Sequence, residues 1–253
     1  MHSEIIPNRV IIKITGLDAA SFLQGLISND ITQAENKLVY TALLSPKGKY
    51  LFDFFITSHG DGFLLDVLAP YAAKLIQRLN MYKLRADVAL IETNIAVGRG
   101  VGLAPQGSFS DPRHSALGWR IYGLEGNEIS TVNWDSIRVE HCIPETGIEL
   151  ISDETYILEA GFERMSGVSF RKGCYVGQEI TARMKHKTAL RKGLVTVDIW
   201  GLAPIGTNIL SNGKIAGQLF TQSGEKAIAY LRFDRVSADM TAGTAKVNYC
   251  EPV

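Results

Sequence analysis

The chain has 253 residues, and its 26 Lys and Arg balance its 26 Asp and Glu, so its formal net charge at pH 7 is zero. Hydrophobic residues make up 46% and charged residues 21%, an ordinary globular composition that excludes disordered and fibrous classes. The charge balance also excludes a protein that binds nucleic acid over its whole surface. A chain of this length buries a substantial core without disulfides or metals.

The cysteines and the N-terminal residues bear on the compartment. Cys142, Cys174 and Cys250 are odd in number and form no CxxC pair, which indicates free thiols in a reducing compartment. The first residues lack the basic start and apolar stretch of a signal peptide, and Glu4 argues against a transit peptide. No apolar run reaches the roughly 18 residues of a membrane span. We therefore expect a cytoplasmic protein that does not interact with membranes.

The first two thirds of the chain alternate irregularly between strand-like and helix-like segments. Behind Asp18, the apolar residues Phe22, Leu23 and Leu26 recur at helical spacing, which indicates a helix with Asp18 as its N-cap. Residues 45–48, Ser-Pro-Lys-Gly, fit a type I turn, so the strands on either side should form a hairpin. In chain order, the predicted elements are strand 10–14, the helix after Asp18, strands 39–44, 50–57 and 63–67, a helix opened by Pro70, strands 86–92 and 95–101, and a helix over about 131–142.

The last third changes to short strands separated by turns. The runs 194–199, 208–210, 215–219 and 227–232 are rich in β-formers, and Asn212-Gly213 between the second and third is a strong hairpin signal. This pattern is typical of a small all-β barrel or sandwich. We therefore predict an α+β protein of two regions, residues 1–190 and residues 191–253, the second being a β-barrel module.

Several motifs that would indicate other functions are incomplete. Residues 98–103, Gly-Arg-Gly-Val-Gly-Leu, lack the last glycine and the following helix of a dinucleotide fingerprint. Cys and His residues are not spaced as metal ligands, so we predict no metal site. A cysteine protease or acyltransferase needs a His within hydrogen-bond reach of its thiol. The sequence offers His59, His114, His141 and His186 but does not locate any of them relative to Cys174.

Asp53 is a first candidate for chemistry. In strand 50–57, Tyr50, Phe52, Phe54 and Ile56 alternate onto one apolar face, which leaves Asp53 on the other face between two apolar neighbours. Partial desolvation would favour the neutral carboxyl and suit proton transfer or binding of a ring N–H. The alternative is an ordinary acid on a wetted strand face.

A second candidate is the segment 171–192, where seven Lys and Arg residues meet a single acid, Glu179. Cys174 lies there between two glycines, which lets the backbone turn sharply and be approached closely. Cationic neighbours raise the thiolate fraction of a cysteine, so a reactive, partly exposed thiol beside an anion-attracting patch is one interpretation. The other is a buried structural cysteine beside a solvated basic run. The run lacks the interleaved aromatic residues that stack on bases, so we expect no direct nucleic-acid binding.

The string Lys-Gly-Cys-Tyr-Val-Gly-Gln-Glu at 172–179 resembles the KGCYxGQE signature of the YgfZ-type folate-binding proteins. These proteins are relatives of the glycine-cleavage T-protein, an aminomethyltransferase, and serve iron–sulfur protein maturation. The resemblance extends over about residues 8–235. It includes segments 18–30, 40–48, 82–85, 111–113, 118–120, 138–145 and 180–183.

This resemblance implies a cloverleaf of two interleaved α+β modules and a C-terminal β-barrel around a central channel that holds tetrahydrofolate. In the T-protein, a glutamate in an R-L-E-A-G string holds the pterin ring, and this chain has Leu158-Glu159-Ala160-Gly161. Glu159 is therefore the implied pterin contact. The other folate contacts implied by matching segments are Asn29, Tyr40, Lys83, Arg85 and Arg183.

The T-protein also carries an Asp-Asp pair, needed for methylene transfer, where this chain has Phe52-Asp53. One acid is missing, and aminomethyl transfer survives only if the essential acid aligns with Asp53. The leading hypothesis is a monomeric tetrahydrofolate-binding protein that assists assembly or repair of iron–sulfur proteins, with Cys174 as the functional thiol. Its clients would include tRNA-modifying iron–sulfur enzymes, as in bacterial members. The alternatives are a folate-dependent aminomethyltransferase, with Asp53 in catalysis, and a folate-binding scaffold without chemistry.

Overall fold

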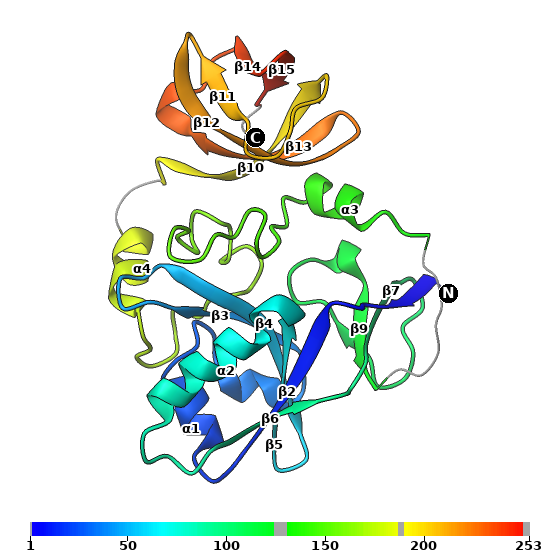
Figure 1. Ribbon diagram of the computed structural model, residues 1–253, viewed down its shortest axis with the longest axis vertical. Coiled ribbons are helices and arrows are strands. Elements are labelled where there is room, and N and C mark those ends of the chain that lie inside the picture. Colours follow the sequence, from blue (N-terminus) through cyan, green and yellow to red (C-terminus); the bar gives the residue numbers. More distant parts are fainter. Residues whose placement is uncertain (1, 124–130, 187–189, 250–253) are drawn as a thin grey trace. The chain divides into compact units, whose positions relative to one another are not determined.

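The computed structural model describes residues 2–123, 131–186 and 190–249. By their contacts the residues fall into two compact units, coloured along the chain in Figure 1. The first unit comprises residues 1–132 and 163–180, and the second comprises residues 133–162 and 181–253.

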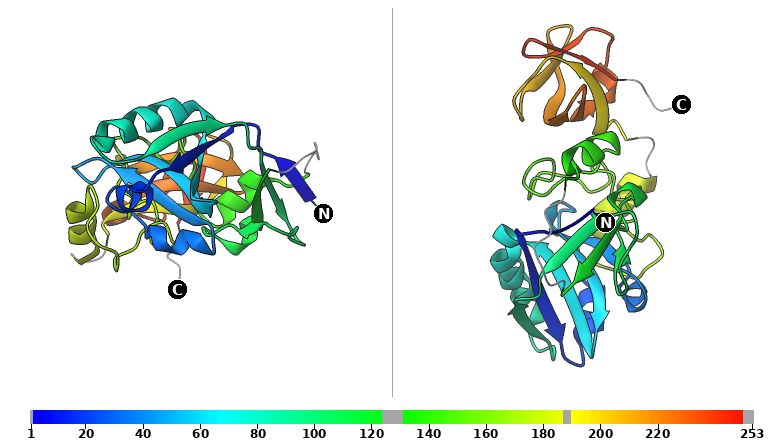
Figure 2. Two further views of the ribbon diagram at one scale, coloured as in Figure 1. Left: turned by 90° about the horizontal axis from the view of Figure 1, so that it is seen from below. Right: turned by 90° about the vertical axis from the view of Figure 1, so that its right-hand side faces the viewer.

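A five-stranded antiparallel sheet forms the centre of the first unit. Its strand order is β3 (Val39–Leu44), β4 (Tyr50–His59), β5 (Gly62–Leu68), β2 (Arg9–Thr15) and β6 (Ala89–Thr93). One face packs against α1 (Ala19–Gln24), a 3₁₀ turn over Ile31–Glu35, and α2 (Ala69–Lys83). Figure 2 shows α2 lying along this face. Pro70 occupies the first turn of α2, where its missing N–H costs no helical hydrogen bond.

A second, smaller sheet belongs to the same unit. Its order is β1 (His2–Ile5), β7 (Val97–Val101), β9 (Trp119–Tyr122) and β8 (Phe109–Ser110), and a 3₁₀ turn over Ser115–Leu117 precedes β9. Buried Ile11, Leu64 and Val97 pack together and join the two sheets. The face of the large sheet opposite α2 is thereby turned towards β8 and β9 and their loops.

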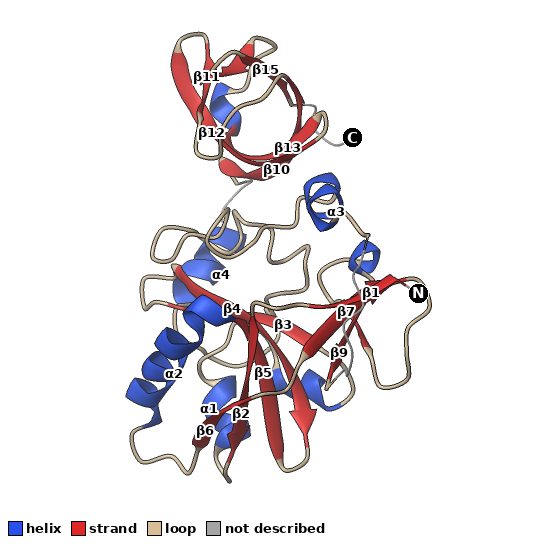
Figure 3. Cartoon of the chain, turned by 45° about the vertical axis from the view of Figure 1, so that its right-hand side comes forward, coloured by secondary structure: helices blue, strands red, loops and turns tan. Residues whose placement is uncertain are grey.

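The second unit is built on a closed barrel of six strands (Figure 3). In barrel order the strands are β10 (Lys192–Trp200), β13 (Lys226–Arg232), β12 (Lys214–Ser223), β11 (Asn208–Ser211), β14 (Met240–Ala242) and β15 (Ala245–Asn248), and β15 pairs back with β10. A 3₁₀ turn covers Phe233–Arg235. Helix α3 (Trp134–Glu140) packs on the barrel through Val139, and Arg138 pairs with Glu149, which also accepts a hydrogen bond from Thr221. Helix α4 covers Gln178–His186.

The fold class predicted from the sequence, α+β with a C-terminal β-barrel, is confirmed. The hairpin of β3 and β4, the helix opened by Pro70 and the barrel hairpin are also confirmed, and Asn212 and Gly213 take φ of 49° and 74°, as an Asn-Gly hairpin turn requires. Some predicted elements are too long, because β6 and β7 begin three and two residues later than expected and α3 covers only 134–140. The division into residues 1–190 and 191–253 stays a prediction; the barrel itself begins at Lys192.

Candidate functional site

A β-bulge in β4 decides which side chains surround Asp53. Phe52 lies opposite Leu43 and Tyr50 opposite Leu44, so Leu51 is an extra residue in the strand. Leu51 and Phe52 both join the core that α2 covers. The bulge shifts Tyr50 onto the opposite face, beside Asp53. The predicted alternation of Tyr50 with Phe52 is therefore wrong, because it assumed an unbroken strand.

Asp53 is half-buried and both of its carboxylate oxygens accept hydrogen bonds. The Tyr40 hydroxyl donates to Oδ2 at 2.9 Å and the Tyr50 hydroxyl donates to Oδ1 at 2.7 Å. Burial and the nearby Asp53 charge raise the pKa of Tyr40 well above its ordinary value of 10.0, so this phenol stays a donor. The two tyrosines thus hold the carboxylate in a fixed position.

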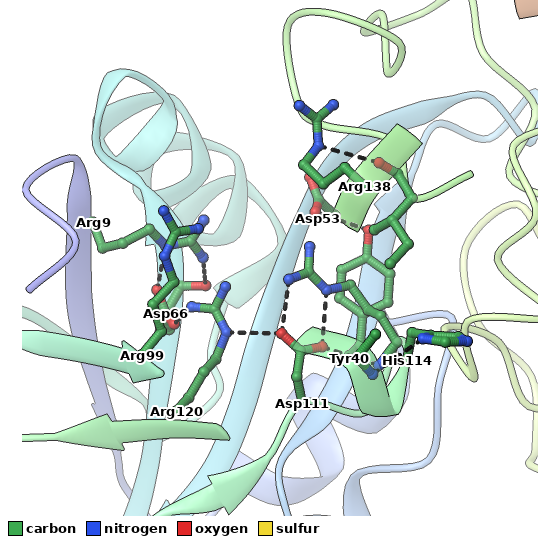
Figure 4. Close-up of polar contacts among 12 residues, drawn as sticks. Arg9, Tyr40, Asp53, Asp66, Arg99, Asp111, His114, Arg120 and Arg138 are labelled. Atoms are coloured by element: carbon green, nitrogen blue, oxygen red, sulfur yellow. Dashed lines mark hydrogen bonds and ion pairs between the residues drawn. The ribbon is translucent and has the colours of Figure 1, made fainter. Parts of the chain in front are cut away.

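A chain of alternating charges continues from Asp53 across the same face of the sheet (Figure 4). Asp66 pairs with Arg9 and with Arg120, whose Nη1 is 3.0 Å away. Asp111 accepts from Arg120 Nε at 3.2 Å and from Arg113 Nη2 at 2.7 Å. Burial alone would raise the pKa of Asp111, but the two guanidinium groups outweigh it, Arg113 more strongly, and lower the pKa to about 2. The acid therefore stays ionised.

The same arginines cover an aromatic wall. The Arg120 guanidinium carbon lies 4.1 Å from the centre of the Phe55 ring, and that of Arg113 lies 4.9 Å from Phe55 and 5.6 Å from the Tyr40 ring. The Tyr40 and Phe55 rings are 5.2 Å apart. Cation–π contacts of this kind add to the ion pairs. Tyr40, and through it Asp53, is thus held by several independent contacts.

A hollow of about 500 Å³ opens beside Tyr40 within the first unit. Its walls are mostly polar side chains with two aromatic rings: Asn29, Gln33, Asn36, Lys37, Leu38, Val39, Tyr40, Ser108, Phe109, Ser110, Pro112 and Ser166. Asn29 Nδ2 donates to the Tyr40 carbonyl at 2.8 Å and to the Ser166 carbonyl at 2.6 Å. The Asn29 amide thereby joins β3 to the loop that leads to Cys174.

Lys172, the first residue of the signature segment, is buried and not available to attract anions. Its Nζ donates to the carbonyls of Gln24 and Ile27 at 2.6 Å each and to that of Asn29 at 3.0 Å. The Gln24 carbonyl is at the end of α1 and those of Ile27 and Asn29 follow it, and a cation is favoured at a helix C-terminus. Burial lowers the pKa of Lys172 to about 8. Lys172 therefore anchors the segment to the end of α1.

Two other residues of the signature segment are also fixed by their contacts. Tyr175 is buried against Lys172, and Gly177 has φ of 84°. A Cβ at Gly177 would lie 2.6 Å from the Ser45 carbonyl oxygen, so only glycine fits against the turn of the β3–β4 hairpin. Cys174, between these anchors, is exposed and forms no disulfide. Cys142 is buried, and Cys250 and Lys187 lie outside the described residues.

Glu159 belongs to the second unit, where it faces the barrel. The Tyr230 hydroxyl donates to Oε2 at 2.6 Å, and within the described part of the chain no other hydrogen bond reaches the carboxylate. A hollow of about 160 Å³ adjoins it, lined by Glu149, Ile151, Glu154, Thr155, Glu159, Ala160, Leu194, Gln218, Phe220 and Tyr230. Burial, and then the Glu159 charge, raise the pKa of Tyr230. Glu159 thus remains an acceptor in a small, partly aromatic hollow.

The remaining predicted contacts lie elsewhere. Lys83 ends α2 and Arg85 follows it, and α2 covers the face of the sheet opposite Asp53. Arg183 is an exposed residue of α4. The structure therefore brings together Asp53, Tyr40 and Asn29, and the anchor of Cys174 joins them at the Asn29 carbonyl. It separates Lys83 and Arg85 from this group.

Sequence reasoning missed Tyr50 and Arg113 as members of this site. Nothing in the local pattern signals the bulge that turns Tyr50 towards Asp53. Arg113 was visible only as part of Asp111-Pro112-Arg113, and its stacking on Tyr40 joins the turn after β8 to the distant strand β3. Among the described residues, no group of three or more His, Cys, Asp or Glu could hold a metal ion, and no helix is long and apolar enough to cross a membrane.

Part of the sequence and the fold as a whole are similar to those of known proteins. Residues 191–253 match the family described as CAF17, C-terminal beta-barrel domain. The glycine cleavage system aminomethyltransferase T from Bartonella henselae superposes with a TM-score of 0.75, covering 99% of this chain and 85% of that one, at 16% identity. At this identity the likeness shows the fold, which is that of the T-protein.

The curated relatives agree in name. The mouse "Iron-sulfur cluster assembly factor IBA57, mitochondrial" is 26% identical over 95% of this chain and 80% of its own length. Homologues named in the same way from Pyricularia oryzae and Mycosarcoma maydis are each 30% identical, over 75% and 77% of this chain. The chain is similar to iron–sulfur cluster assembly factors. It spans little more than half the length of the two fungal proteins, 55% and 56%.

The names of these relatives correct one expectation. A cytoplasmic location was predicted, and it is contradicted because the relatives are all named as mitochondrial proteins. The reasoning relied on the first residues of the chain, which carry no information about where the relatives act. The expectation of an iron–sulfur role is supported at the level of the relatives' names.

Proposed function

We propose that this chain is a YgfZ-like iron–sulfur cluster assembly factor that binds tetrahydrofolate and presents Cys174 to a client protein. The observation that carries the proposal is the signature segment, in which Lys172, Tyr175 and Gly177 are fixed and the Cys174 thiol between them is exposed. The names of the curated relatives support the iron–sulfur role. The client would include tRNA-modifying iron–sulfur enzymes, as the sequence resemblance implies.

A solvent-facing thiol is accessible to another protein, whereas a buried thiol is not. As a thiolate, it can supply one ligand to iron while a client or assembly protein supplies the others, because iron–sulfur clusters are held mostly by cysteine thiolates. Cys174 has no cysteine or histidine cluster around it among the described residues that could hold a cluster alone. The proposed role is therefore shared ligation at a protein–protein contact, with no change of oxidation state at Cys174.

The folate part of the proposal rests on Glu159. Its carboxylate keeps acceptor capacity after the Tyr230 bond, and it lies beside Phe220 and Leu194 in a hollow of about 160 Å³. That volume is below the range of whole ligand sites, so it would admit one ring of the ligand. A pterin edge, with adjacent N–H donors, matches a carboxylate acceptor. Asn29, Tyr40 and Arg183 stay proposed folate contacts on the sequence resemblance alone.

The alternative function is aminomethyl transfer. Asp53 favours it, because a half-buried carboxylate held by two tyrosines lies on the face of the large sheet opposite α2, in a T-protein fold. Phe52 lies on the other face, in the core, so its position cannot supply a second acid beside Asp53. Turnover of methylene-tetrahydrofolate from an aminomethyl donor, lost in Asp53→Asn, would establish this alternative.

Calorimetric titration of tetrahydrofolate tests the ligand. We expect saturable binding by the wild type and a loss of about 1.5–3 kcal/mol in Glu159→Ala, the value of a hydrogen bond to a charged group. Glu225→Ala, an exposed glutamate in the barrel, is the matched control and should bind as the wild type does. No binding by the wild type would refute the folate part and leave the thiol to be explained without it.

The thiol is tested separately, by restoring iron–sulfur enzyme activity in cells that lack the endogenous factor. Cys174→Ser should fail while Cys142→Ser succeeds, because the Cys142 thiol is buried and not accessible to a client. Full restoration by Cys174→Ser would exclude a ligand role for this sulfur.

A further inference from the structure

One end of the first unit carries three large apolar side chains that are exposed to solvent. Leu17, in the loop between β2 and α1, is 94% exposed, and Leu84, just after α2, is 89% exposed. Met81, one turn before Leu84 on α2, is 64% exposed. Single exposed apolar residues are ordinary, but three of them at one end of a unit are not. We call Leu17, Met81 and Leu84, together with the basic residues Lys74, Arg78, Lys83 and Arg85, the loop-end surface.

The two loops of this surface are tied to each other. The Asp18 amide donates to the Asp87 carbonyl at 3.2 Å, and the Asp87 amide donates to Asp18 Oδ2 at 2.8 Å. The Leu17 amide donates to Asp87 Oδ2 at 3.3 Å, and Gly16 approaches the Asp87 carbonyl so closely that any Cβ would clash. Leu17 and Leu84 therefore lie on two loops that are hydrogen-bonded to each other, and the loops do not move independently.

Leu84 is also in a backbone conformation that disfavours it. Its φ is 46° and its ψ is −106°, and the Ala86 amide donates to the Lys83 carbonyl at 2.8 Å. These values match the first central position of a type II′ turn, where glycine is preferred. A leucine here is strained and yet packs against almost nothing. Strained residues that the structure retains are candidates for function.

The charge around these side chains is one-sided. Residues 69–86 contain four basic residues, Lys74, Arg78, Lys83 and Arg85, and no acid, in a chain whose total charge is zero. Lys83 and Arg85 form no ion pair with any residue that the structure describes. Asp18 and Asp87 offset the charges of Lys83 and Arg85, so the remaining charge of +2 comes from Lys74 and Arg78 on α2. The surface remains net positive.

We propose that the loop-end surface docks reversibly on an anionic lipid surface. Leu17, Met81 and Leu84 would enter the boundary between headgroups and acyl chains, while the basic residues of α2 and its C-terminal turn would meet the lipid phosphates. A fluid bilayer accepts side chains that protrude this far, whereas a protein partner would need hollows shaped to receive them. The contact is peripheral. It goes beyond the proposed function and does not depend on it.

Co-sedimentation with vesicles tests the proposal. The full chain should bind vesicles of phosphatidylcholine with about one third phosphatidylglycerol, and should not bind phosphatidylcholine alone. Leu84→Gly should weaken this binding about tenfold, because a large apolar side chain is lost from the interface. Its melting temperature should stay the same or rise, because glycine relaxes the turn. A merely structural role for Leu84 predicts no effect on sedimentation.

Two further variants make the result specific. Leu202→Gly removes a leucine that is 83% exposed on the barrel, and it should sediment as the wild type does. Lys83→Gln combined with Arg85→Gln should weaken binding, and added salt should then have less effect than on the wild type. Absence of wild-type binding to the anionic vesicles would overturn the proposal and point to a protein as the occupant. Equal losses in Leu84→Gly and Leu202→Gly would overturn it as well.

Discussion

Lys172→Met should loosen the segment that presents Cys174 without changing the thiol itself. Methionine is similar in length to lysine and apolar, but it cannot donate to the carbonyls of Gln24, Ile27 and Asn29. Since all three acceptors lie at the end of α1 or just beyond it, the variant removes the main polar connection between that helix and the signature segment.

The magnitude follows from two opposing contributions. An acceptor left without its donor costs about 1–2 kcal/mol, so three cost about 3–6 kcal/mol. Removing the ammonium also removes its desolvation cost. The lowering of the Lys172 pKa from 10.5 to about 8 puts that cost at about 3 kcal/mol, and partial solvent screening reduces it to about 2 kcal/mol. The free energy of unfolding should therefore fall by about 1–4 kcal/mol, the difference between these two contributions.

Urea denaturation measures this loss, and amide hydrogen exchange locates it. The Val176 amide, which donates to the Gly25 carbonyl at 3.3 Å, should exchange faster in Lys172→Met. Lys214→Met, at an exposed lysine of the barrel, is the control and should change neither quantity. If Lys172→Met unfolds within about 0.5 kcal/mol of the wild type, the three hydrogen bonds do not anchor the segment and the reasoning fails.

Two further predictions concern the charged network and the hairpin turn. Asp111 has its pKa lowered from 3.8 to about 2, so its ion pairs stabilise the fold above pH 4 and are lost as the pH falls through 2. The unfolding free energies of the wild type and Asp111→Asn, followed by urea denaturation against pH, should converge by about 2 kcal/mol between pH 4 and pH 2; a constant difference would contradict this. Gly177→Ala should lower the melting temperature, because its Cβ would meet the Ser45 carbonyl at 2.6 Å at a φ of 84°, whereas Gly173→Ala, which meets nothing within 4 Å, should not.

Elements with strong local signals were predictable from the sequence. The Ser-Pro-Lys-Gly turn at 45–48, Pro70 at the start of α2 and Asn212-Gly213 in the barrel each act through a few adjacent residues. Strands β8, β14 and β15 have only two to four residues, too few to show an alternating pattern. Their positions depend on the partner strands.

The site was predictable only in part, because its members meet through distant contacts. Asp53, Tyr40 and Cys174 could be named as candidates, but the Lys172–Ile27 hydrogen bond that anchors the Cys174 segment joins positions 145 apart, so no local pattern reveals it. For this reason the basic residue beside Cys174 was interpreted as attracting anions, while it serves as a buried anchor. The exposed position of Cys174 follows from those same contacts and not from its neighbours in sequence.

Tyr50→Phe distinguishes two roles for Asp53, a structural hydrogen-bond acceptor and a group that exchanges protons in catalysis. Both Asp53 oxygens already accept tyrosine hydrogen bonds, so any proton transfer to Asp53 must weaken at least one of them. If Asp53 is a structural acceptor, Tyr50→Phe should cost about 1 kcal/mol of stability and leave client activation in the cell assay unchanged. If Asp53 exchanges protons in aminomethyl transfer, losing the Tyr50 donor destabilises its anion and should shift the acidic limb of the pH–rate profile to higher pH. Tyr249→Phe, in the barrel, is the control. A shifted profile would favour the enzyme, whereas lost stability with unchanged client activation would favour the assembly factor.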